Sequence, residues 1–388
     1  MSEWIKAEEY CVSVFDGTHD TPKVTETGYK LVTSKNILSN TLDIKSAYYI
    51  SEEDFVNINK RSKVKQYDIL FSMIGTVGSL YFETSDTIDY AIKNIGVFSC
   101  GNKEKAEWLY YYLQSSYAQK YIKRYLNGAV QKFLPLKGLR EFPVPQFNKE
   151  LHNRIKILLN IDQKIQINNQ INQELEAMAK TLYDYWFVQF DFPDQNGKPY
   201  KSSGGKMVYN PELKRQIPEG CGVEKLSHFL TIKNGKDHKH LQDGKFAVYG
   251  SGGIMRTVTD YLYSGESILF PRKGTLNNVM YVNEKFWTVD TMFYSEVNKN
   301  NSALYVFYSV KDIDFNKLNT GTGVPSMTSS ILYDLSIIVP EENILEKFNT
   351  IVKQNYETIK LNSIQNQELT QLRDWLLPML MNGQVKVE

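Results

Sequence analysis

One stretch of this sequence occurs twice, and the duplication constrains the fold more than any other feature. The segment Asn-Gln-Glu-Leu begins at residue 172 and again at residue 366, so the copies stand 194 residues apart, half the length of the 388-residue chain. Each copy follows a short apolar segment that ends in Val-Pro, at residues 142–145 and 337–340. Self-similarity over so long a period indicates that a whole structural unit is repeated. We therefore predict two similar halves, related by a pseudo-twofold axis.

Both copies of the repeat end in a stretch with apolar residues at heptad spacing. Leu151, Leu158 and Ile165 mark this period in the first copy, and Leu345 and Val352 mark it in the second. This spacing, with further apolar residues between, is typical of helices in coiled coils. We expect the two long helices to pair with each other as an antiparallel coiled coil. A parallel homodimer through the same helices is the alternative.

Asparagines interrupt both apolar seams at matching places. Asn168 and Asn172 stand in the first seam, and Asn362 and Asn366 stand in the second. A buried asparagine costs stability, but it fixes the register and the number of partner helices. We predict this role for all four residues.

A region of mixed α and β character precedes each long helix. Both regions contain an Ile-Leu-Phe strand that leads into a Gly-Thr pair, at residues 69–76 and 268–275. We expect helices around residues 104–126 and 301–311, and one strand-like segment over residues 286–297. The fold class is therefore α+β, with two α/β globular domains in tandem, separated by the paired helices. The expected order is domain (1–147), helix (148–190), a connector rich in Gly, Pro, Ser and Lys (191–216), domain (217–340) and helix (341–388).

The overall charge excludes a simple polycationic binder. The chain has 45 basic and 44 acidic side chains, and each globular region is close to neutral. A nucleic-acid binder with locally arranged charge remains open.

The sequence also predicts the cellular compartment. Its 3 cysteines, Cys11, Cys100 and Cys221, lie far apart, which excludes a disulfide scaffold and a Cys-x-x-Cys site and fits a reducing cytosol. The first residues do not resemble a signal peptide, and no apolar run reaches the ~18 residues that a membrane span requires. We expect a cytoplasmic protein without a membrane segment.

Motifs of common catalytic sites are absent from the sequence. There is no P-loop and no His-Glu-x-x-His, and Asn210-Pro211-Glu212-Leu213 departs from the Asn-Pro-Pro-Tyr of amino-methyltransferases. Asp237, His238 and His240 match no common zinc spacing, so we interpret them as a polar loop and expect no metal. We expect no active site in this chain.

The polar loops of both globular regions suit contact with nucleic acid. Arg, Asn, Ser and Thr side chains read base edges, and Lys binds phosphates, although clustered lysines are often only solvated surface. Related loops in both halves favour binding. For Arg272, an ion pair with Asp290 is the alternative to a DNA contact. The candidates are Lys35, Arg61, Lys63, Lys65, Gly75, Thr76 and Lys132 in the first region, and Lys236, His238, Lys239, Ser251, Arg272, Lys273, Thr275, Asn277, Asn278, Thr322 and Ser326 in the second.

The order and spacing of several motifs resemble a known family over nearly the whole chain. The sequence is similar to the specificity subunits of type I restriction–modification systems. The segments that carry the resemblance are YDIL…IGTVG (67–78), WFVQFDFPDQNGKPYKSSGGKMV (186–208), NGKDHK (234–239), VYGSGG (248–253), RKGTLNN (272–278), VDTMF (289–293) and LLPMLMNGQV (376–385).

This resemblance implies a function for each part. Each globule is expected to be a target-recognition domain that reads one half of a split double-stranded DNA sequence. The helices are expected to hold the domains apart and to bind two methyltransferase subunits, which carry S-adenosylmethionine and methylate an adenine in each half-site. Motor-nuclease subunits, which use ATP and Mg, are expected to join the complex. The chain itself is expected to bind no cofactor.

Two further expectations concern the helices. A helix of ~35 residues spans ~50 Å, against ~34 Å for one turn of B-DNA, which predicts a gapped target. Apolar residues outside the seams predict a second stripe that partner subunits cover. This stripe comprises Ile155, Leu159, Ile167, Ile344, Ile351 and Leu361.

Two other functions remain open from the residues alone. One is a coiled-coil adaptor with two ligand-binding globules, and the other is a stand-alone DNA-modifying enzyme. Salt-dependent binding to duplex DNA distinguishes the expected function from the adaptor.

Overall fold

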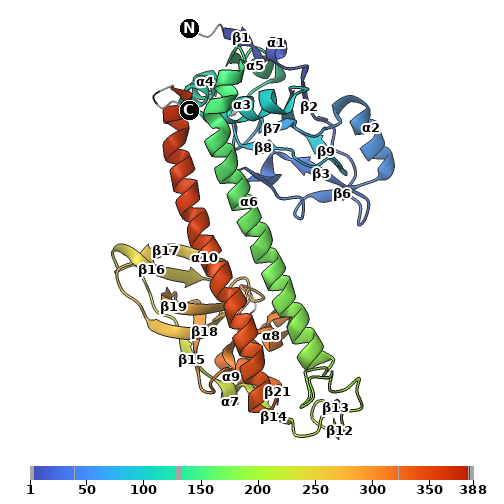
Figure 1. The fold of residues 1–388 in the computed structure, drawn as a ribbon, viewed down its shortest axis with the longest axis vertical. Helices are drawn as coiled ribbons and strands as arrows, with labels where there is room; N and C mark the ends of the chain where they lie inside the picture. The colour runs from blue at the N-terminus through green and yellow to red at the C-terminus, as the bar shows by residue number, and fades with distance from the viewer. Residues whose placement is uncertain (1–3, 39, 127–132, 322, 383, 385–388) are drawn as a thin grey trace. The chain divides into compact units, whose positions relative to one another are not determined.

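The computed structural model describes residues 4–38, 40–126, 133–321, 323–382 and 384. The chain divides into two compact units (Figure 1). Unit 1 consists of residues 1–166 and 365–388, and unit 2 consists of residues 167–364. Each unit therefore contains one globular domain and a part of each long helix. This arrangement confirms two mixed α/β domains in tandem.

The first domain is built on a four-stranded and a three-stranded sheet, with strand orders β2-β10-β7-β8 and β6-β3-β9, together with the pairs β1-β11 and β4-β5. Side-chain caps begin two of its helices, since Ser51 accepts a hydrogen bond at the start of α2 and Asn102 does so at the start of α3. The elements are β1 (Trp4–Lys6), α1 (Ala7–Tyr10), β2 (Ser13–Asp16), β3 (Tyr29–Thr33), η1 (Ser34–Asn36), β4 (Ile37–Leu38), β5 (Thr41–Leu42), β6 (Tyr48–Ile50), α2 (Glu52–Ser62), β7 (Ile69–Ser72), β8 (Leu80–Phe82), β9 (Tyr90–Lys93), β10 (Ile95–Ser99), α3 (Lys103–Gln114), α4 (Ser116–Leu126), α5 (Leu136–Arg140) and β11 (Pro143–Pro145).

The second domain is built on one six-stranded sheet, ordered β15-β20-β18-β19-β16-β17, in which only β16 and β19 run parallel. The connector before it forms the β12-β13 hairpin. The elements are η2 (Asp184–Val188), β12 (Met207–Asn210), β13 (Arg215–Pro218), β14 (Gly222–Lys225), α7 (Leu226–Phe229), β15 (Leu230–Asn234), β16 (Asp243–Gly250), β17 (Gly253–Val258), β18 (Tyr263–Pro271), β19 (Met280–Thr288), β20 (Met292–Val297), α8 (Ala303–Lys311), η3 (Phe315–Leu318), α9 (Ser329–Tyr333) and β21 (Ser336–Val339).

The first and last strands of each domain pair in the same way. Strand β1 pairs antiparallel with β11, and β14 pairs antiparallel with β21. The closing strand leads directly into a long helix in both cases, α6 (Lys149–Tyr183) and α10 (Glu342–Met381). The pseudo-repeat read from the sequence is therefore present in the strand pairing.

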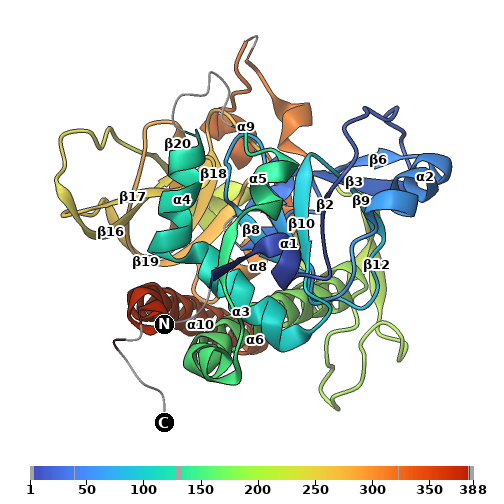
Figure 2. The same ribbon diagram turned by 90° about the horizontal axis from the view of Figure 1, so that it is seen from above.

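The long helices α6 and α10 pack antiparallel, as predicted (Figures 1 and 2). In unit 2, the Nδ2 atom of Asn362 donates a hydrogen bond of 2.8 Å to the Oδ1 atom of Asn172. In unit 1, Arg373 of α10 contacts Asp162 of α6 at 2.9 Å. Asn168, another predicted register residue, is fully buried.

Two predictions about the helices are wrong. Ile155 and Ile344 do not belong to a free apolar stripe, because both are buried in the cores of unit 1 and unit 2 respectively. Leu159 packs partly against the same core as Ile155. The other three residues of the predicted stripe are exposed: Ile167 (43%), Ile351 (45%) and Leu361 (67%).

Two expected elements are interrupted. The helix predicted around residues 104–126 is divided into α3 and α4 at Ser115, whose hydroxyl accepts a hydrogen bond from the amide of Ala118. The strand predicted over residues 286–297 is divided by a turn at residues 289–291, where the amide of Met292 bonds to the carbonyl of Val289. No described helix has the length and apolar character to span a membrane.

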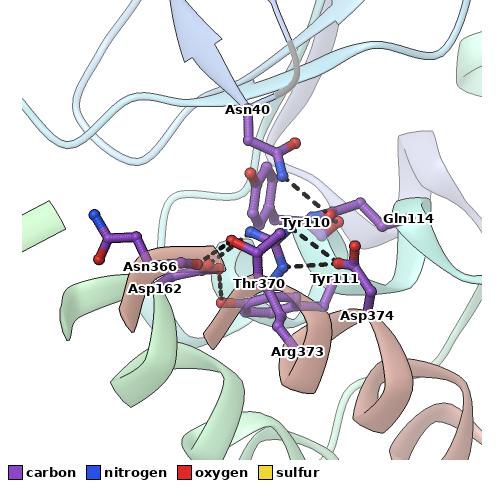
Figure 3. Close-up of polar contacts among 9 residues, drawn as sticks. All are labelled: Asn40, Tyr110, Tyr111, Gln114, Asp162, Asn366, Thr370, Arg373 and Asp374. Carbon is purple, nitrogen blue, oxygen red and sulfur yellow. Dashed lines mark hydrogen bonds and ion pairs between the residues drawn. The ribbon is translucent and has the colours of Figure 1, made fainter. Parts of the chain in front are cut away.

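A polar network joins both long helices to the core of unit 1 (Figure 3). The hydroxyl of Tyr111 donates a 2.5 Å hydrogen bond to one carboxylate oxygen of Asp162, while Arg373 contacts the other oxygen. Burial, together with the negative charge of Asp162, raises the pKa of Tyr111. The hydroxyl is therefore a protonated donor at neutral pH, and the carboxylate is bound on both sides.

The first prediction tests this network. Tyr111→Phe should lower the free energy of local opening of α3 by about 1.5–3 kcal/mol, because the hydrogen bond to a charged acceptor is lost. Tyr117→Phe is the control, because Tyr117 is 52% exposed and its hydroxyl has no hydrogen bond among the described residues. This control should change stability by less than about 0.5 kcal/mol. Native-state hydrogen exchange of the α3 amides measures both, and equal effects would contradict the assigned role.

Candidate nucleic-acid interface

Three predicted polar segments of the second domain meet at the turn between β19 and β20. The amides of Gly235 and Lys236 bond to the carbonyls of Met292 and Thr288, each at 2.9 Å. The amide of Arg272 bonds to the carbonyl of Thr291 at 2.8 Å. The amide of Val289 bonds to Tyr249, which precedes the Gly-Ser-Gly-Gly turn, at 3.1 Å. Backbone contacts therefore bring together segments that lie far apart in the sequence.

A fourth segment, residues 319–321 and 323–327, completes this arrangement. The amide of Gly274 bonds to the carbonyl of Pro325 at 3.0 Å, and the amide of Met327 bonds to the carbonyl of Arg272 at 2.9 Å. We call residues 234–240, 250–253, 272–278, 319–321 and 323–327 the second-domain loop cluster.

Side chains also hold this cluster together. The side chain of Asn278 donates to the carbonyl of Ser251 at 2.8 Å, and that of Asn277 donates to Asp314 at 3.1 Å. The bond from Asn277 lowers the pKa of Asp314. These two asparagines are therefore already engaged within the protein. Thr275 and Asn277 are exposed, and Ser251, Asn278 and Ser326 are half-buried.

Arg272 and Lys273 place two positive charges on the surface of the cluster. Both are exposed, and the guanidinium of Arg272 lies 5.9 Å from the ring centre of Phe293. Among the described residues, no carboxylate lies within 4.0 Å of Arg272, so the alternative ion pair with Asp290 does not form. An uncompensated guanidinium on a structured turn is suited to bind phosphate or a guanine edge.

The basic loop after β15 has a different character. Lys236 and Lys239 are exposed, whereas His238 is half-buried and its buried Nδ1 atom has no hydrogen-bond partner within the described part of the chain. The ring nitrogen of Trp287 donates to the carbonyl of Lys236 at 3.0 Å. The bond from Trp287 therefore fixes the backbone of this loop, while the side chains of the two lysines remain exposed to solvent.

The first domain builds its Gly-Thr turn in the same way as the second. The amide of Leu134 bonds to the carbonyl of Met73 at 3.0 Å, as Met327 does to Arg272. Ile74 pairs with Phe133, as Lys273 pairs with Ser326. Gly75 and Thr76 are exposed on this turn. The two turns therefore have equivalent backbones.

The predicted cations of the first domain that the structure describes stand on other elements than this turn. Lys35 is exposed on η1, and Lys63 and Lys65 are exposed after α2. Arg61 instead bonds to the carbonyl of Gly17 at 3.2 Å and lies 3.8 Å from Asp16. Lys132 and Thr322 lie outside the described residues.

Sequence reasoning missed the loop at residues 16–23. Its glycine, Gly17, bonds to Ile95, and the next amide, of Thr18, bonds to Ile92, which matches the bonds of Gly235 and Lys236. His19 on this loop contacts Asn94 at 2.8 Å and Asp16 at 2.9 Å. The sequence signal that could have revealed this loop is an acidic or amide residue followed by glycine. It occurs at the end of an early strand in both domains. A hollow of about 720 Å³ between this loop and α2 is lined in part by His19, Lys23 and Arg61.

Sequence reasoning also missed the basic face of α4. Lys120, Lys123 and Arg124 are exposed, and none forms an ion pair among the described residues. Their spacing of three and four residues puts them on one side of the helix. Ile122 of α4 lies 3.5 Å from the position that a Cβ atom at Gly78 would occupy, so this helix packs beside the Gly-Thr turn.

The described residues contain no group of three or more His, Cys, Asp or Glu side chains arranged to hold a metal ion. With exposed cations, amides and hydroxyls on structured loops, the arrangement is suited to bind a polyanion.

Both halves of the chain match one protein family. Residues 19–177 and 218–371 match the family described as "Type I restriction modification DNA specificity domain". The chain is 29% identical over 315 residues to the type I restriction enzyme MjaIX specificity subunit of Methanocaldococcus jannaschii, covering 73% of this chain and 70% of that protein. It is 22% identical over 408 residues to the HindI specificity subunit of Haemophilus influenzae, covering 84% and 88%. Its fold is similar to the crystal structure of the S subunit of a type I restriction–modification system from M. genitalium, with a TM-score of 0.53 and 16% identity over 98% of this chain and 96% of that chain.

The second prediction concerns the glycine that holds the loop after β15. A Cβ atom at Gly235 would overlap the carbonyl oxygen of Val289, so Gly235→Ala should lower the free energy of local opening of β19 and β20 by about 1–3 kcal/mol. Gly252→Ala is the control, because nothing lies within 4 Å of a Cβ atom there. Hydrogen exchange of amides 288–292 measures both, and an unperturbed Gly235→Ala protein would contradict the close approach.

Proposed function

The chain belongs to the type I restriction–modification DNA specificity family, and we propose that it reads a double-stranded DNA target in two half-sites separated by an unspecified gap. As a specificity subunit, it recognises DNA for the restriction–modification complex and is not catalytic. The observation that carries the two-part target is the equivalence of the two Gly-Thr turns, since Leu134 bonds to Met73 as Met327 bonds to Arg272. Two domains with the same loop construction suit two separate stretches of DNA.

Each domain divides its contacts between phosphates and bases. Phosphate contacts position a protein on the duplex, whereas side chains in the major groove read its sequence. In the second domain, Lys236, Lys239 and Lys273 are suited to phosphates, and Arg272 is suited to a guanine edge or a phosphate. In the first domain, Lys120, Lys123 and Arg124 of α4 supply the positive charge beside the turn. Affinity should therefore fall as the salt concentration rises.

The helices set the gap between the half-sites. Helix α6 has 35 residues and α10 has 40, so each is longer than one turn of B-DNA, at ~1.5 Å of rise per residue. Their antiparallel pairing makes a stiff spacer.

Two methyltransferase subunits bind at equivalent places on the helices. Three exposed apolar residues of α6 recur at the same repeat positions of α10. A duplicated apolar surface suits two copies of one partner. The pairs are Ile157 (38%) with Ile351 (45%), Ile167 (43%) with Leu361 (67%), and Met178 (60%) with Leu372 (42%).

The chemistry of the complex belongs to these partners. The methyltransferase subunits carry S-adenosylmethionine and methylate one adenine in each half-site. Motor-nuclease subunits, which use ATP and Mg, join the same complex and cut unmodified DNA. This chain contributes recognition and assembly only.

The third prediction tests independent reading by the two domains. Replacing residues 217–340 with another second domain of the family should change one half of the methylated motif and leave the other half intact. A genome-wide map of methylated adenines, in cells carrying the complex, measures this. Replacement of residues 1–147 is the matched exchange and should change only the opposite half. A change in both halves from one replacement would contradict the proposal.

The fourth prediction tests the Arg272 contact. Arg272→Ala should weaken binding of the complex to its target by about 1–3 kcal/mol if the side chain reads a base. A phosphate contact would cost less and would lower the salt dependence. Arg215→Ala is the control, because Arg215 is also exposed and lies 5.1 Å from a phenylalanine ring, Phe190, but stands on β13. Titration at several salt concentrations measures both, and wild-type affinity in a normally stable Arg272→Ala complex would reject the contact.

A further inference from the structure

The two equivalent Gly-Thr turns carry side chains of different chemistry. Positions that hold Arg272, Lys273 and Ser326 in the second domain hold Met73, Ile74 and Phe133 in the first. Met73 is fully buried, whereas Ile74 is 39% exposed and Phe133 is 36% exposed. At the exposed positions compared here, equivalent backbones therefore carry Lys273 with Ser326 in one domain and Ile74 with Phe133 in the other.

The backbone holds this apolar pair at the surface. The hydroxyl of Ser72 donates to the carbonyl of Ile74 at 3.1 Å, and Ile74 forms an antiparallel bridge with Phe133. Gly75 follows with φ of 77°, and none of the described residues lies within 4 Å of a Cβ atom there. The turn is therefore held by main-chain bonds and by Ser72, and the side chain of Ile74 is exposed on it.

Three exposed cations of the first domain stand on a different element from the pair. Lys120, Lys123 and Arg124 stand on α4, whose Ile122 packs beside Gly78 of the same turn. Between α8 and α9, the second domain has the single turn η3 instead, and its cations stand on the Gly-Thr turn itself. Among the described residues of the first domain, the turn thus carries the apolar side chains of Ile74 and Phe133, and these three cations stand on the helix.

We propose that Ile74, supported by Phe133, contacts the 5-methyl group of a thymine in the major groove of the half-site read by the first domain. This inference rests on the proposed function. The thymine methyl is the apolar feature of the major groove, and apolar side chains recognise it. The equivalent turn of the second domain, with Arg272 and Lys273, fits a guanine edge or a phosphate instead. The two half-sites are therefore read by different chemistry at equivalent places.

The test removes one methyl group from the DNA. After the methylated motif is mapped, each thymine of the first half-site is replaced by uracil, one at a time, in duplexes that are titrated with the complex of this chain and its methyltransferase. One replacement should weaken binding about threefold to fivefold, the effect of withdrawing one buried methyl group. A thymine in the second half-site that faces the equivalent turn, with Arg272 and Lys273, should show no such loss of affinity when it is replaced by uracil.

A variant links that effect to Ile74. In the Ile74→Ala complex, the sensitive thymine and its uracil replacement should bind equally well. Val56→Ala is the control, because Val56 is 47% exposed on α2, away from the turn, and should keep the full difference. The uracil series on the wild-type complex needs no variant, so a misfolded Ile74→Ala protein would not remove the test.

The outcomes distinguish this inference from the function on which it rests. If the complex binds a split motif but no uracil replacement weakens it, or if the first half-site has no thymine on either strand, the methyl contact is wrong and the function stands. If Ile74→Ala keeps the difference between thymine and uracil, another residue makes the contact and the proposal is overturned. If the complex has no sequence-specific affinity for DNA, the proposed function itself fails, and this contact fails with it.

Discussion

Antiparallel pairing of α6 and α10 is the constraint on which both domains depend, because the helices supply part of each core. A core that takes residues from both helices cannot close until the helices have paired, so domain folding and helix pairing are coupled. Each compact unit therefore consists of one globular domain with a part of each helix. The helix residues buried in these cores are Leu151, Ile155, Leu158 and Leu380 in unit 1, and Ala179, Ile344, Leu345, Phe348 and Val352 in unit 2.

In each unit, a carboxylate also binds α10. It accepts a hydrogen bond from a tyrosine hydroxyl and forms an ion pair with a basic side chain of α10. Asp162 has this role in unit 1, with Tyr111 and Arg373. In unit 2, Glu266 accepts a 2.8 Å hydrogen bond from Tyr281 and lies 3.6 Å from Lys353 of α10. Burial raises the pKa of both tyrosines, so both remain donors at neutral pH. The tyrosine and the carboxylate come from different elements in the two units, so this similarity lies in the chemistry and not in the duplicated sequence.

The sequence predicted the parts of the fold that depend on periodicity, and it failed where tertiary contacts decide. Heptad spacing identifies both long helices, but it cannot show that Ile155 and Ile344 face a globular core. An apolar residue beside a seam has the same sequence pattern whether it packs against a domain or faces a partner subunit. The turn at residues 289–291 lies between segments with strong β preference, and only bonds from distant loops reveal it. At the candidate interface, the second-domain loops were found because their cations stand in loops. The basic residues of α4 were missed because they stand on a helix.

The two domains combine an equivalent backbone at these loops with different exposed side chains. Gly17 and Gly235 must be small, because a Cβ atom at either would overlap a backbone carbonyl oxygen. These glycines constrain the backbone of the loops, but they do not constrain which side chains the loops expose. A substitution on the Gly-Thr turn, such as lysine in place of Ile74, changes what the loop presents without changing the bonds that hold it, since those bonds come from main-chain atoms and Ser72. The exposed side chains of this turn can therefore differ between the two domains while the main-chain bonds that hold it stay the same.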